Sequence, residues 1–384
     1  MKGSIRKRGS SYQYRISYRI NDKRFYIEKG GFKLKKDCEA AMNKAIKEIL
    51  ETGTYVNIKK MSFDELFNEF ITVEAPLTRK ETTIKRYKSL YKNNFKSVFE
   101  NKYVHLIKAP DIQSFYLDAM ERLSSTYVRS MHNLFLVLFN YAIRMEYIKD
   151  NIMEKVIPPK DNRSEIQIYT LEELEWISER LKDNNMIMPF MLGMHLGLRT
   201  GEAYALRWSD IDFQKNTVKI DKQVQKIDGE WCFDTLKTSN SYRTITFGNV
   251  LKKFLLEAKA KQEIYKKSIK LYKINKVLDY RDRDKINIIV VDDFVNIKPN
   301  GEKLTPHSNK VISRICSKEK GINFKYHNLR HTHATLLLEK GLNPKYIQTR
   351  LGHSKLETTL RLYTHVTTKM EERAAEITDV IYAF

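Results

Sequence analysis

The sequence predicts a multidomain fold in three parts: an N-terminal α+β unit (a three-stranded sheet plus one helix), a central all-α bundle, and a C-terminal mixed α+β unit that is mainly helical. Three observations predict this fold. Residues 1–60 change from alternating to helical spacing of apolar side chains, residues 61–150 keep helical spacing, and the remainder mixes both patterns. The length of 384 residues allows two to four domains of roughly 100–200 residues each. We place the domains at 1–55, 61–150 and 167–384.

The N-terminal unit begins with a strictly alternating segment, SYQYRISYRI at 11–20. One face carries Tyr12, Tyr14, Ile16, Tyr18 and Ile20, and the other carries Gln13, Arg15, Ser17 and Arg19. A period of two is typical of a half-buried strand. A turn at Asn21-Asp22 leads to a second strand at 23–29, residues 5–8 supply a third, and a helix at 35–51 covers the apolar face.

Charge is the strongest feature of the composition. Lys and Arg number 69 against 47 Asp and Glu, which gives a net charge of +22. Such an excess favours a polyanionic partner, because each neutralised phosphate releases counterions. Residues 1–60 alone hold 16 basic and 6 acidic side chains. A Lys-rich protein without any polyanionic partner is the alternative.

The polar face of the predicted sheet is a candidate DNA-binding surface. We expect Gln13, Arg15 and Arg19 to contact DNA there, since a sheet can enter the major groove and Arg and Gln suit base edges. A face that is only solvated remains the alternative interpretation.

The other two units are predicted from caps and periodicity. A capping box of Ser62 and Glu65 opens a helix that runs to about Val73, and a second box of Thr170 and Glu173 opens the last unit. Asp228-Gly229 indicates a hairpin turn, and a charged linker with Pro158-Pro159 occupies 149–168. Further helices are expected at 81–96, 110–122, 125–147, 171–182, 187–196, 249–272 and from near 307, 327, 343 and 355, with strands at 217–224, 230–236, 242–247 and 286–291.

The sequence also excludes several classes of protein. Cys38, Cys232 and Cys316 are too far apart to suggest a disulfide scaffold or a Cys-based zinc site. No run of about 18 apolar residues is present, and the N-terminus MKGSIRKRGS lacks the apolar core of a signal peptide. We therefore expect a cytoplasmic protein that does not enter a membrane.

Three segments carry the chemistry: HLGLRTGEAYALRWSDID at 195–212, LKTSNSYRTI at 236–245, and HNLRHTHATLLLEKGLNPKYIQTRLGHSKLETTLRLYTHV at 327–366. In order and spacing they resemble the tyrosine recombinase (integrase) family. The resemblance covers the three-part layout of the whole chain, although it is specific only in 195–366. It implies an arm-type DNA-binding domain, a core-binding helical domain and a catalytic domain, in that order.

The resemblance implies a role for each matching residue. Arg199 and Arg330 match the two catalytic arginines, Glu202 the acidic residue that supports the first, and Lys237 the lysine on a β-hairpin. His327 matches the histidine of the His-x-x-Arg pair, His353 the histidine of the third motif, and Tyr363 the nucleophile. Alone, each of these residues would more often be solvated or packed, so it is the joint pattern that carries the prediction.

The residue types also suit the chemistry on physical grounds. Planar guanidinium groups can hold the two non-bridging oxygens of a phosphodiester as these oxygens gain charge. The Tyr363 hydroxyl, with an ordinary pKa of about 10, needs proton removal, for which His327 is the best-placed base. Lys237 can protonate the leaving 5′ oxygen, and His353 can donate another hydrogen bond to the phosphate.

No cofactor or metal is expected. His331 and His333 are two residues apart on a predicted helix and so project to different faces, and no ligand set completes a metal site. There is no phosphate-binding loop of the GxxxxGK type, and a phosphotyrosine linkage conserves the bond energy, so ATP is unnecessary.

The expected partner is double-stranded DNA with core and arm sites. The resemblance further implies a homotetramer on DNA, a host DNA-bending protein, an excision factor and a location at the bacterial nucleoid. An N-terminal sheet domain is typical of integrases from temperate phages and conjugative transposons.

Two other functions stay open at this point. A type IB topoisomerase would use similar chemistry as a monomer and would relax DNA that lacks any attachment site. A non-catalytic DNA-binding regulator would be expected to have lost a catalytic residue.

Overall fold

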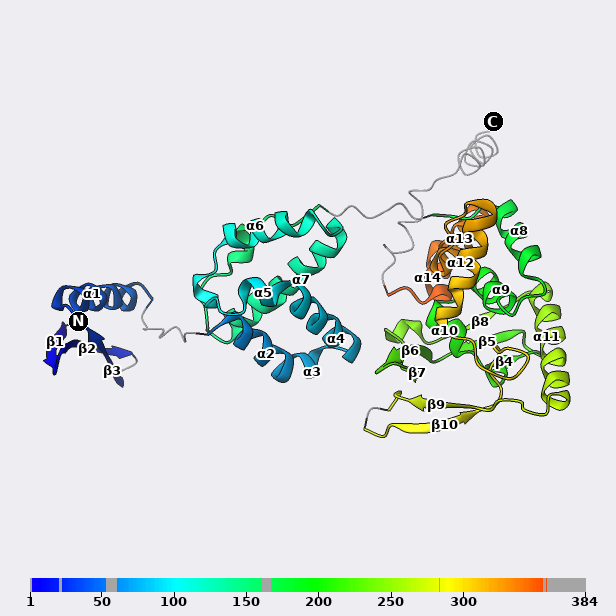
Figure 1. Cartoon of the computed structure of the whole chain (residues 1–384), viewed down its shortest axis with the longest axis horizontal. Helices are drawn as coiled ribbons and strands as arrows, with labels where there is room; N and C mark the ends of the chain where they lie inside the picture. Colours follow the sequence, from blue (N-terminus) through cyan, green and yellow to red (C-terminus); the bar gives the residue numbers. More distant parts are fainter. Residues whose placement is uncertain are drawn as a thin grey trace, which may run out of the picture. The chain divides into compact units, whose positions relative to one another are not determined.

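The computed structural model describes residues 2–20, 23–52, 61–160, 167–282, 284–354 and Glu357. The chain divides into two compact units, Met1–Arg163 and Ser164–Phe384 (Figure 1). The three domain boundaries given above stay a prediction.

The first unit begins with the expected sheet and helix. Its elements are β1 Lys2–Arg8, β2 Ser11–Ile20, β3 Lys23–Phe32 and α1 Lys35–Thr52. The strands are antiparallel in the order β1-β2-β3. Tyr14 and Ile16 of β2 are buried against Cys38, Ala45 and Ile49 of α1, so the alternating pattern predicted the packed face correctly.

The polar face of β2 differs from the expectation at Gln13. This side chain is buried, because Gly30 and Gly31 of β3 lie opposite it where the register shifts. A Cβ on Gly30 would come within 3.0 Å of the Gln13 Cβ, so the absence of a side chain lets β3 pack over Gln13. With its amide oxygen turned toward Arg6, Gln13 accepts two hydrogen bonds of 2.7 Å from that guanidinium.

Arg15 remains about half exposed on the same face. It lies over the ring of Tyr26, 4.5 Å from the ring centroid, and 3.5 Å from the carboxylate of Glu28. Arg19 lies on β2 opposite Arg24, but its side chain lies outside the described residues.

The remainder of the first unit is helical, as predicted. The capping box is present: Ser62 Oγ accepts from the Glu65 N–H at 3.1 Å, and the Ser62 N–H donates to the Glu65 carboxylate at 2.7 Å. The helices are α2 Phe63–Val73, α3 Ala75–Thr78, α4 Glu81–Leu90, a π-helical turn Tyr91–Phe95, α5 Lys96–Phe99, α6 Ala109–Met120 and α7 Ser125–Arg144. Aromatic side chains such as Phe63, Phe95 and Phe135 fill its core.

The second unit combines seven helices of the described residues with two sheets. The helices are α8 Leu171–Leu181, α9 Ile187–Leu196, α10 Thr200–Ala205, α11 Asn249–Ser268, α12 Asn309–Lys320, α13 Tyr326–Glu339 and α14 Pro344–Leu351. The strands are β4 Ile211–Asp212, β5 Thr217–Ile220, β6 Gln223–Ile227, β7 Glu230–Asp234, β8 Arg243–Thr246, β9 Asn275–Asp279 and β10 Asn287–Val291.

The two sheets have the orders β10-β9-β7-β6 and β4-β5-β8. In Figure 1 the helices α12 to α14 gather at one end of the unit, whereas the hairpin of β9 and β10 projects at the other. Among the described residues, the segments with the predicted catalytic side chains meet where α9, α10, β8, α13 and α14 contact one another.

One strand prediction was wrong, and two strands, β4 and β9, were not predicted. The single strand expected at 217–224 is divided between β5 and β6, which belong to different sheets. The break falls at Asp221-Lys222, where the buried Lys222 ammonium binds Asp210 at 2.7 Å and Asp221 at 3.0 Å. The strand β9 was not predicted because its short sequence, NKVLD, places charged side chains among the apolar ones. The helix expected from near 355 lies largely outside the described residues.

None of the helices described in the structure is long and apolar enough to cross a membrane.

Candidate active site

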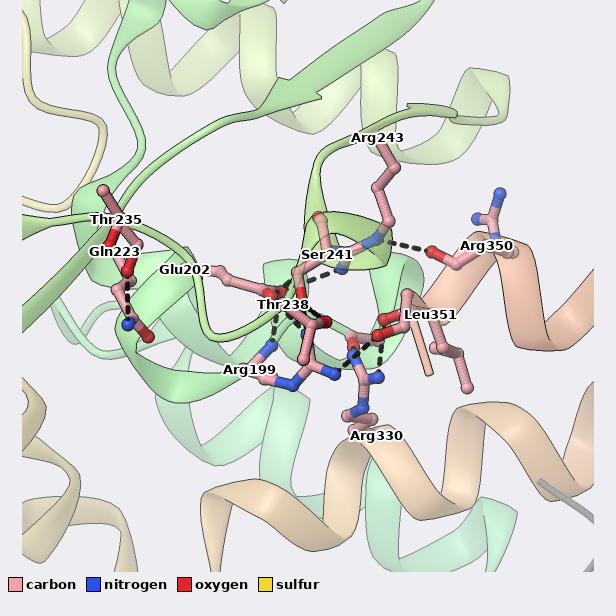
Figure 2. A network of polar contacts seen from close by, with 12 residues as sticks. Arg199, Glu202, Gln223, Thr235, Thr238, Ser241, Arg243, Arg330, Arg350 and Leu351 are labelled. Atoms are coloured by element: carbon pink, nitrogen blue, oxygen red, sulfur yellow. Dashed lines mark hydrogen bonds and ion pairs between the residues drawn. The ribbon is translucent and has the colours of Figure 1, made fainter. Parts of the chain in front are cut away.

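The site is centred on Glu202, a carboxylate that is almost completely buried in α10. Arg199 immediately precedes this helix, and its backbone N–H donates to Glu202 Oε2 at 3.0 Å. Its side chain also donates from Nη1 to Glu202 Oε1 at 2.7 Å. The spacing of three residues thus places the predicted catalytic arginine and its predicted supporting residue in direct contact (Figure 2).

Arg330 approaches the same carboxylate from α13, but it is only 1% exposed. Its Nη1 donates to the Gly197 carbonyl at 2.9 Å and its Nη2 to the Leu351 carbonyl at 2.6 Å. These carbonyls lie at the C-terminal ends of α9 and α14, where backbone acceptors have no partner within the helix. The negative ends of two helix dipoles therefore hold this buried guanidinium.

Two glycines allow these helix ends to turn toward the arginines. Gly197 ends α9 with φ 63°, and Gly352 ends α14 with φ 68°. Both conformations are left-handed and favour glycine. The Gly352 carbonyl accepts a 2.8 Å hydrogen bond from Arg199 Nη2, so each glycine contributes an acceptor to one of the two arginines.

Sequence reasoning missed two residues of this network, Ser241 and Arg243. Ser241 Oγ lies 3.3 Å from Arg199 Nη1 and 3.0 Å from Thr238 Oγ1. Arg243 at the start of β8 donates to both carboxylate oxygens of Glu202, at 3.2 and 2.8 Å. The strand pattern could have indicated it, because Arg243 shares a face of β8 with the buried Ile245 rather than with the exposed Thr244 and Thr246.

Lys237 lies in the loop between β7 and β8 rather than on the hairpin strand itself, and it is exposed. The loop is fixed on both sides of it. Gln223 Nε2 donates to the Thr235 carbonyl at 2.8 Å, and Thr238 joins Ser241 and hence Arg199. Lys237 is therefore attached to the arginine network through its neighbour Thr238, which Figure 2 shows beside Ser241 and Arg199.

The predicted histidines lie close to the arginines. Burial and the positive charges of Arg330 and Arg199 lower the pKa of His327 to about 4. The same causes lower the pKa of the buried His353 to about 3. Both rings are therefore neutral at physiological pH in the absence of DNA. His331 stacks edge-on against His327 at 4.7 Å, whereas His333 turns to α9 and contacts the Met194 carbonyl, as their spacing predicted.

The electrostatics of the carboxylate favour its charged form. Burial by itself raises the pKa of Glu202, but the hydrogen bonds and charge of Arg243, together with the charges of Arg330 and Arg199, outweigh it and lower the pKa to about 2. One negative charge thus faces three guanidinium groups. The excess positive charge makes this a site for an anion.

Two groups of predicted residues remain. Tyr363 lies outside the described residues. Gln13, Arg15 and Arg19 belong to the N-terminal sheet. No three His, Cys, Asp or Glu side chains in the described part of the chain are grouped closely enough to hold a metal ion.

This arrangement defines a class of site, in which arginines are fixed around a buried carboxylate and neutral histidines lie near them. Such a site suits phosphoryl transfer from a phosphodiester. The chain belongs to the phage integrase family, the tyrosine recombinases that break and rejoin DNA, whose family model matches residues 169–370. Two further models match the parts before it: an N-terminal SAM-like domain of phage integrases at 62–120, and an arm DNA-binding domain at 4–49.

Individual relatives agree with this assignment. A "Tyrosine recombinase XerC-like" protein of Caldanaerobacter subterraneus is 29% identical and covers 96% of each chain. The integrase of Staphylococcus phage L54a is 27% identical over 86% of this chain and 96% of its own.

Solved structures share the fold at lower identity. The Tn1549 transposon integrase, in complex with a circular intermediate DNA, superimposes with a TM-score of 0.66 at 18% identity, over 83% of this chain and 99% of that one. The lambda integrase tetramer bound to a Holliday junction gives a TM-score of 0.58 at 16% identity, over 94% of each chain.

Proposed function

We propose that this chain is a site-specific integrase that inserts and excises a mobile element by cutting and rejoining DNA through a 3′-phosphotyrosine intermediate at Tyr363. The observation that carries the proposal is the buried Glu202 with Arg199, Arg243 and Arg330 around it. The proposed reaction requires no ATP, because the phosphotyrosine bond retains the energy for religation. It requires no metal, because the two arginines and Lys237 supply the charge stabilisation that Mg²⁺ supplies in two-metal nucleases.

In this proposal the scissile phosphate binds at the arginines. Arg199 is the more accessible of the two catalytic candidates, with 25% of its side chain exposed. Among the described residues it uses three of five N–H donors, and Arg330 uses two. Because Arg330 is buried, its contact with the phosphate requires that the groups covering it shift when DNA binds.

The proton transfers follow from the protonation states. The neutral His327 accepts the Tyr363 hydroxyl proton as the tyrosine oxygen bonds to phosphorus. The bond from phosphorus to the 5′ oxygen breaks, and that oxygen takes a proton from Lys237. His353 donates a hydrogen bond to the phosphate. Religation reverses these steps with a different 5′ hydroxyl, so no net proton is consumed.

The N-terminal sheet binds a second class of site in this proposal. Arg15 is the predicted residue whose described side chain is exposed and can approach base edges by leaving Glu28, and the match to an arm DNA-binding domain supports this role. The buried Gln13 would act through Arg6, which it holds, rather than contact DNA. The role of Arg19 stays a prediction.

The proposed partners follow from the family. Double-stranded DNA supplies core and arm sites, and four protomers exchange strands in two pairs, in keeping with the lambda integrase tetramer bound to a Holliday junction. A host DNA-bending protein, an excision factor and a place in the bacterial cytoplasm at the nucleoid are further parts of the proposal.

One experiment separates this function from the two alternatives. A plasmid with both ends of the mobile element should yield an excised circle with the wild-type chain and none with Tyr363→Phe. The same plasmid without the ends should stay supercoiled. Relaxation of the site-free plasmid would instead indicate a topoisomerase. If Tyr363→Phe binds DNA and replaces the wild-type chain in the cell without loss of effect, the protein is a regulator.

A further inference from the structure

Arg243 is a buried arginine of the site to which no role has been assigned. It stands at the start of β8, with 5% of its side chain exposed. Four of its five N–H donors have acceptors among the described residues: two go to Glu202, one to the Ser241 carbonyl at 2.8 Å and one to the Arg350 carbonyl at 2.7 Å. A guanidinium committed in this way has little capacity left for a phosphate.

The hydrogen bonds divide the Glu202 carboxylate evenly between two arginines. Oε1 accepts from Arg199 Nη1 and Arg243 Nη1, at 2.7 and 3.2 Å. Oε2 accepts from the Arg199 backbone N–H and Arg243 Nη2, at 3.0 and 2.8 Å. Each oxygen thus has one bond from each residue, so the carboxylate cannot rotate without losing bonds to both. Arg243 therefore fixes the orientation of the Glu202 carboxylate, and through it the position of Arg199.

The remaining bonds of Arg243 extend this control to neighbouring segments. The Ser241 carbonyl belongs to the loop that follows Lys237, and Ser241 Oγ contacts Arg199. The Arg350 carbonyl is in the last turn of α14, three residues before His353. One side chain thus ties together α10, the Lys237 loop and the end of α14, as Figure 2 shows.

We propose that Arg243 is a positioning residue for DNA cleavage: it does not contact DNA, but holds Glu202 so that Arg199 and the loop of Lys237 are in place before DNA binds. This inference rests on the proposed integrase function. A preorganised site avoids reorganisation during the reaction, and a misplacement of about 1 Å can cost about 10²-fold in rate.

The protonation of Glu202 gives a readout that a purely structural role would not change. The charged or titratable groups that face Glu202 are Arg199, Arg243, Arg330, His327 and Tyr326. Arg243 contributes the most among the groups that lower the pKa of Glu202 to about 2. Without Arg243, burial raises this pKa, so Glu202 gains a proton at a higher pH and releases Arg199.

The test uses the full chain and single-turnover cleavage of a core-site duplex, with DNA affinity and melting temperature measured in parallel. Arg243→Met should bind DNA within about twofold of wild type but cleave about 10²-fold more slowly. Its rate should also fall as the pH drops from 7 to 5, where the wild-type rate stays level. Arg243→Lys, which keeps one charge but not the fork, should recover only part of the rate.

A double variant tests whether the two residues act together. Glu202→Gln combined with Arg243→Met should be no slower than the slower single variant, because both changes remove the same support. Arg180→Met is the matched control. It breaks a pair in which Nε and Nη2 of Arg180 bind both oxygens of Glu319 at the surface, so cleavage and its pH profile should not change.

Any one of four results would overturn the inference. A loss of DNA affinity without loss of cleavage would make Arg243 a DNA-binding residue. Rate losses that multiply in the double variant would show independent action. An unchanged pH profile, with a rate that follows the melting temperature alone, would show a structural role. Absence of cleavage by the wild-type chain would overturn the proposed function as well, whereas equal cleavage by wild type and Arg243→Met would overturn this inference alone.

Discussion

The chain places one glutamate between two arginines in two different regions, and the two settings differ in burial. In the N-terminal sheet, Glu28 lies 3.2 Å from Arg6 and 3.5 Å from Arg15, and all three side chains are between 44% and 56% exposed. In the catalytic unit, Glu202 binds Arg199 and Arg243, and its side chain is 1% exposed.

The difference indicates what each arrangement is for. An exposed ion pair contributes little and exchanges readily, so Arg6 and Arg15 can leave Glu28 for DNA. A buried carboxylate with four hydrogen bonds keeps its arginines fixed, because breaking the pair leaves an uncompensated charge. The sheet therefore suits recognition, and the buried cluster suits catalysis.

The largest effect is expected at the buried cluster. Arg199→Ala and Arg330→Ala should each lower the cleavage rate by about 10²–10³, as when one preorganised donor is removed. Single-turnover cleavage of a core-site duplex measures this loss, and Arg180→Ala serves as an exposed control in the same unit. A loss below about threefold in both variants would separate the cluster from the chemistry.

Lys237, which is exposed but attached to the cluster through its loop, should come next. Lys237→Ala should lower cleavage by about 10²-fold, a usual contribution of a general acid. A substrate with sulfur in place of the bridging 5′ oxygen should restore the rate, because a thiolate leaves without protonation. If DNA binding is intact and the sulfur substrate gives no rescue, another group is the acid.

The arm sheet should affect binding rather than chemistry. Arg15→Ala should cost about 1–3 kcal/mol of discrimination between arm and random DNA, measured by competition binding. Deletion of residues 1–60 should abolish arm-site binding and leave core-site cleavage largely intact. Equal arm binding by the truncated and full chains would reduce the sheet to a structural appendage.

The smallest effect should come from the exposed glutamate. Glu28→Gln should change the free energy of unfolding by less than about 1 kcal/mol, whereas Glu202→Gln should cost about 3–5 kcal/mol. Glu28→Gln should also tighten arm binding about twofold to fivefold at low salt, since it frees two arginines. Thermal and urea unfolding of both variants measure the two changes in the free energy of unfolding. Equal destabilisation by Glu28→Gln and Glu202→Gln would contradict the difference drawn between the exposed and the buried glutamate.

Local patterns predicted most of the fold because they are local. The alternation of 11–20 gave the strand and its packed face, and Ser62 with Glu65 gave a helix start that the hydrogen bonds confirm. The errors come from tertiary contacts. The buried pairing of Lys222 with Asp210 breaks a strand, and the glycines of β3 bury Gln13.

The candidate site was predictable in its residue types but not in its connections. Arg199 and Glu202 are three residues apart, so their contact could be expected from the sequence. The carbonyls that hold Arg330 come from Gly197 and Leu351, at the ends of two helices that are remote along the chain. No sequence spacing reports which helix ends meet, so only the structure could show that this arginine is buried.

The central claim is that the arginine cluster serves a covalent reaction at Tyr363, and trapping on a suicide substrate tests it most directly. In a duplex that is nicked just 3′ of the cleavage site, attack releases the short fragment that carries the new 5′ hydroxyl. Religation then has no 5′ hydroxyl to use, so the covalent adduct accumulates. The wild-type chain should form an adduct that peptide mapping places on Tyr363 through a 3′ phosphate, while Tyr363→Phe should bind the duplex equally well and form none. An adduct on another residue, or an equal yield from Tyr363→Phe, would contradict the account.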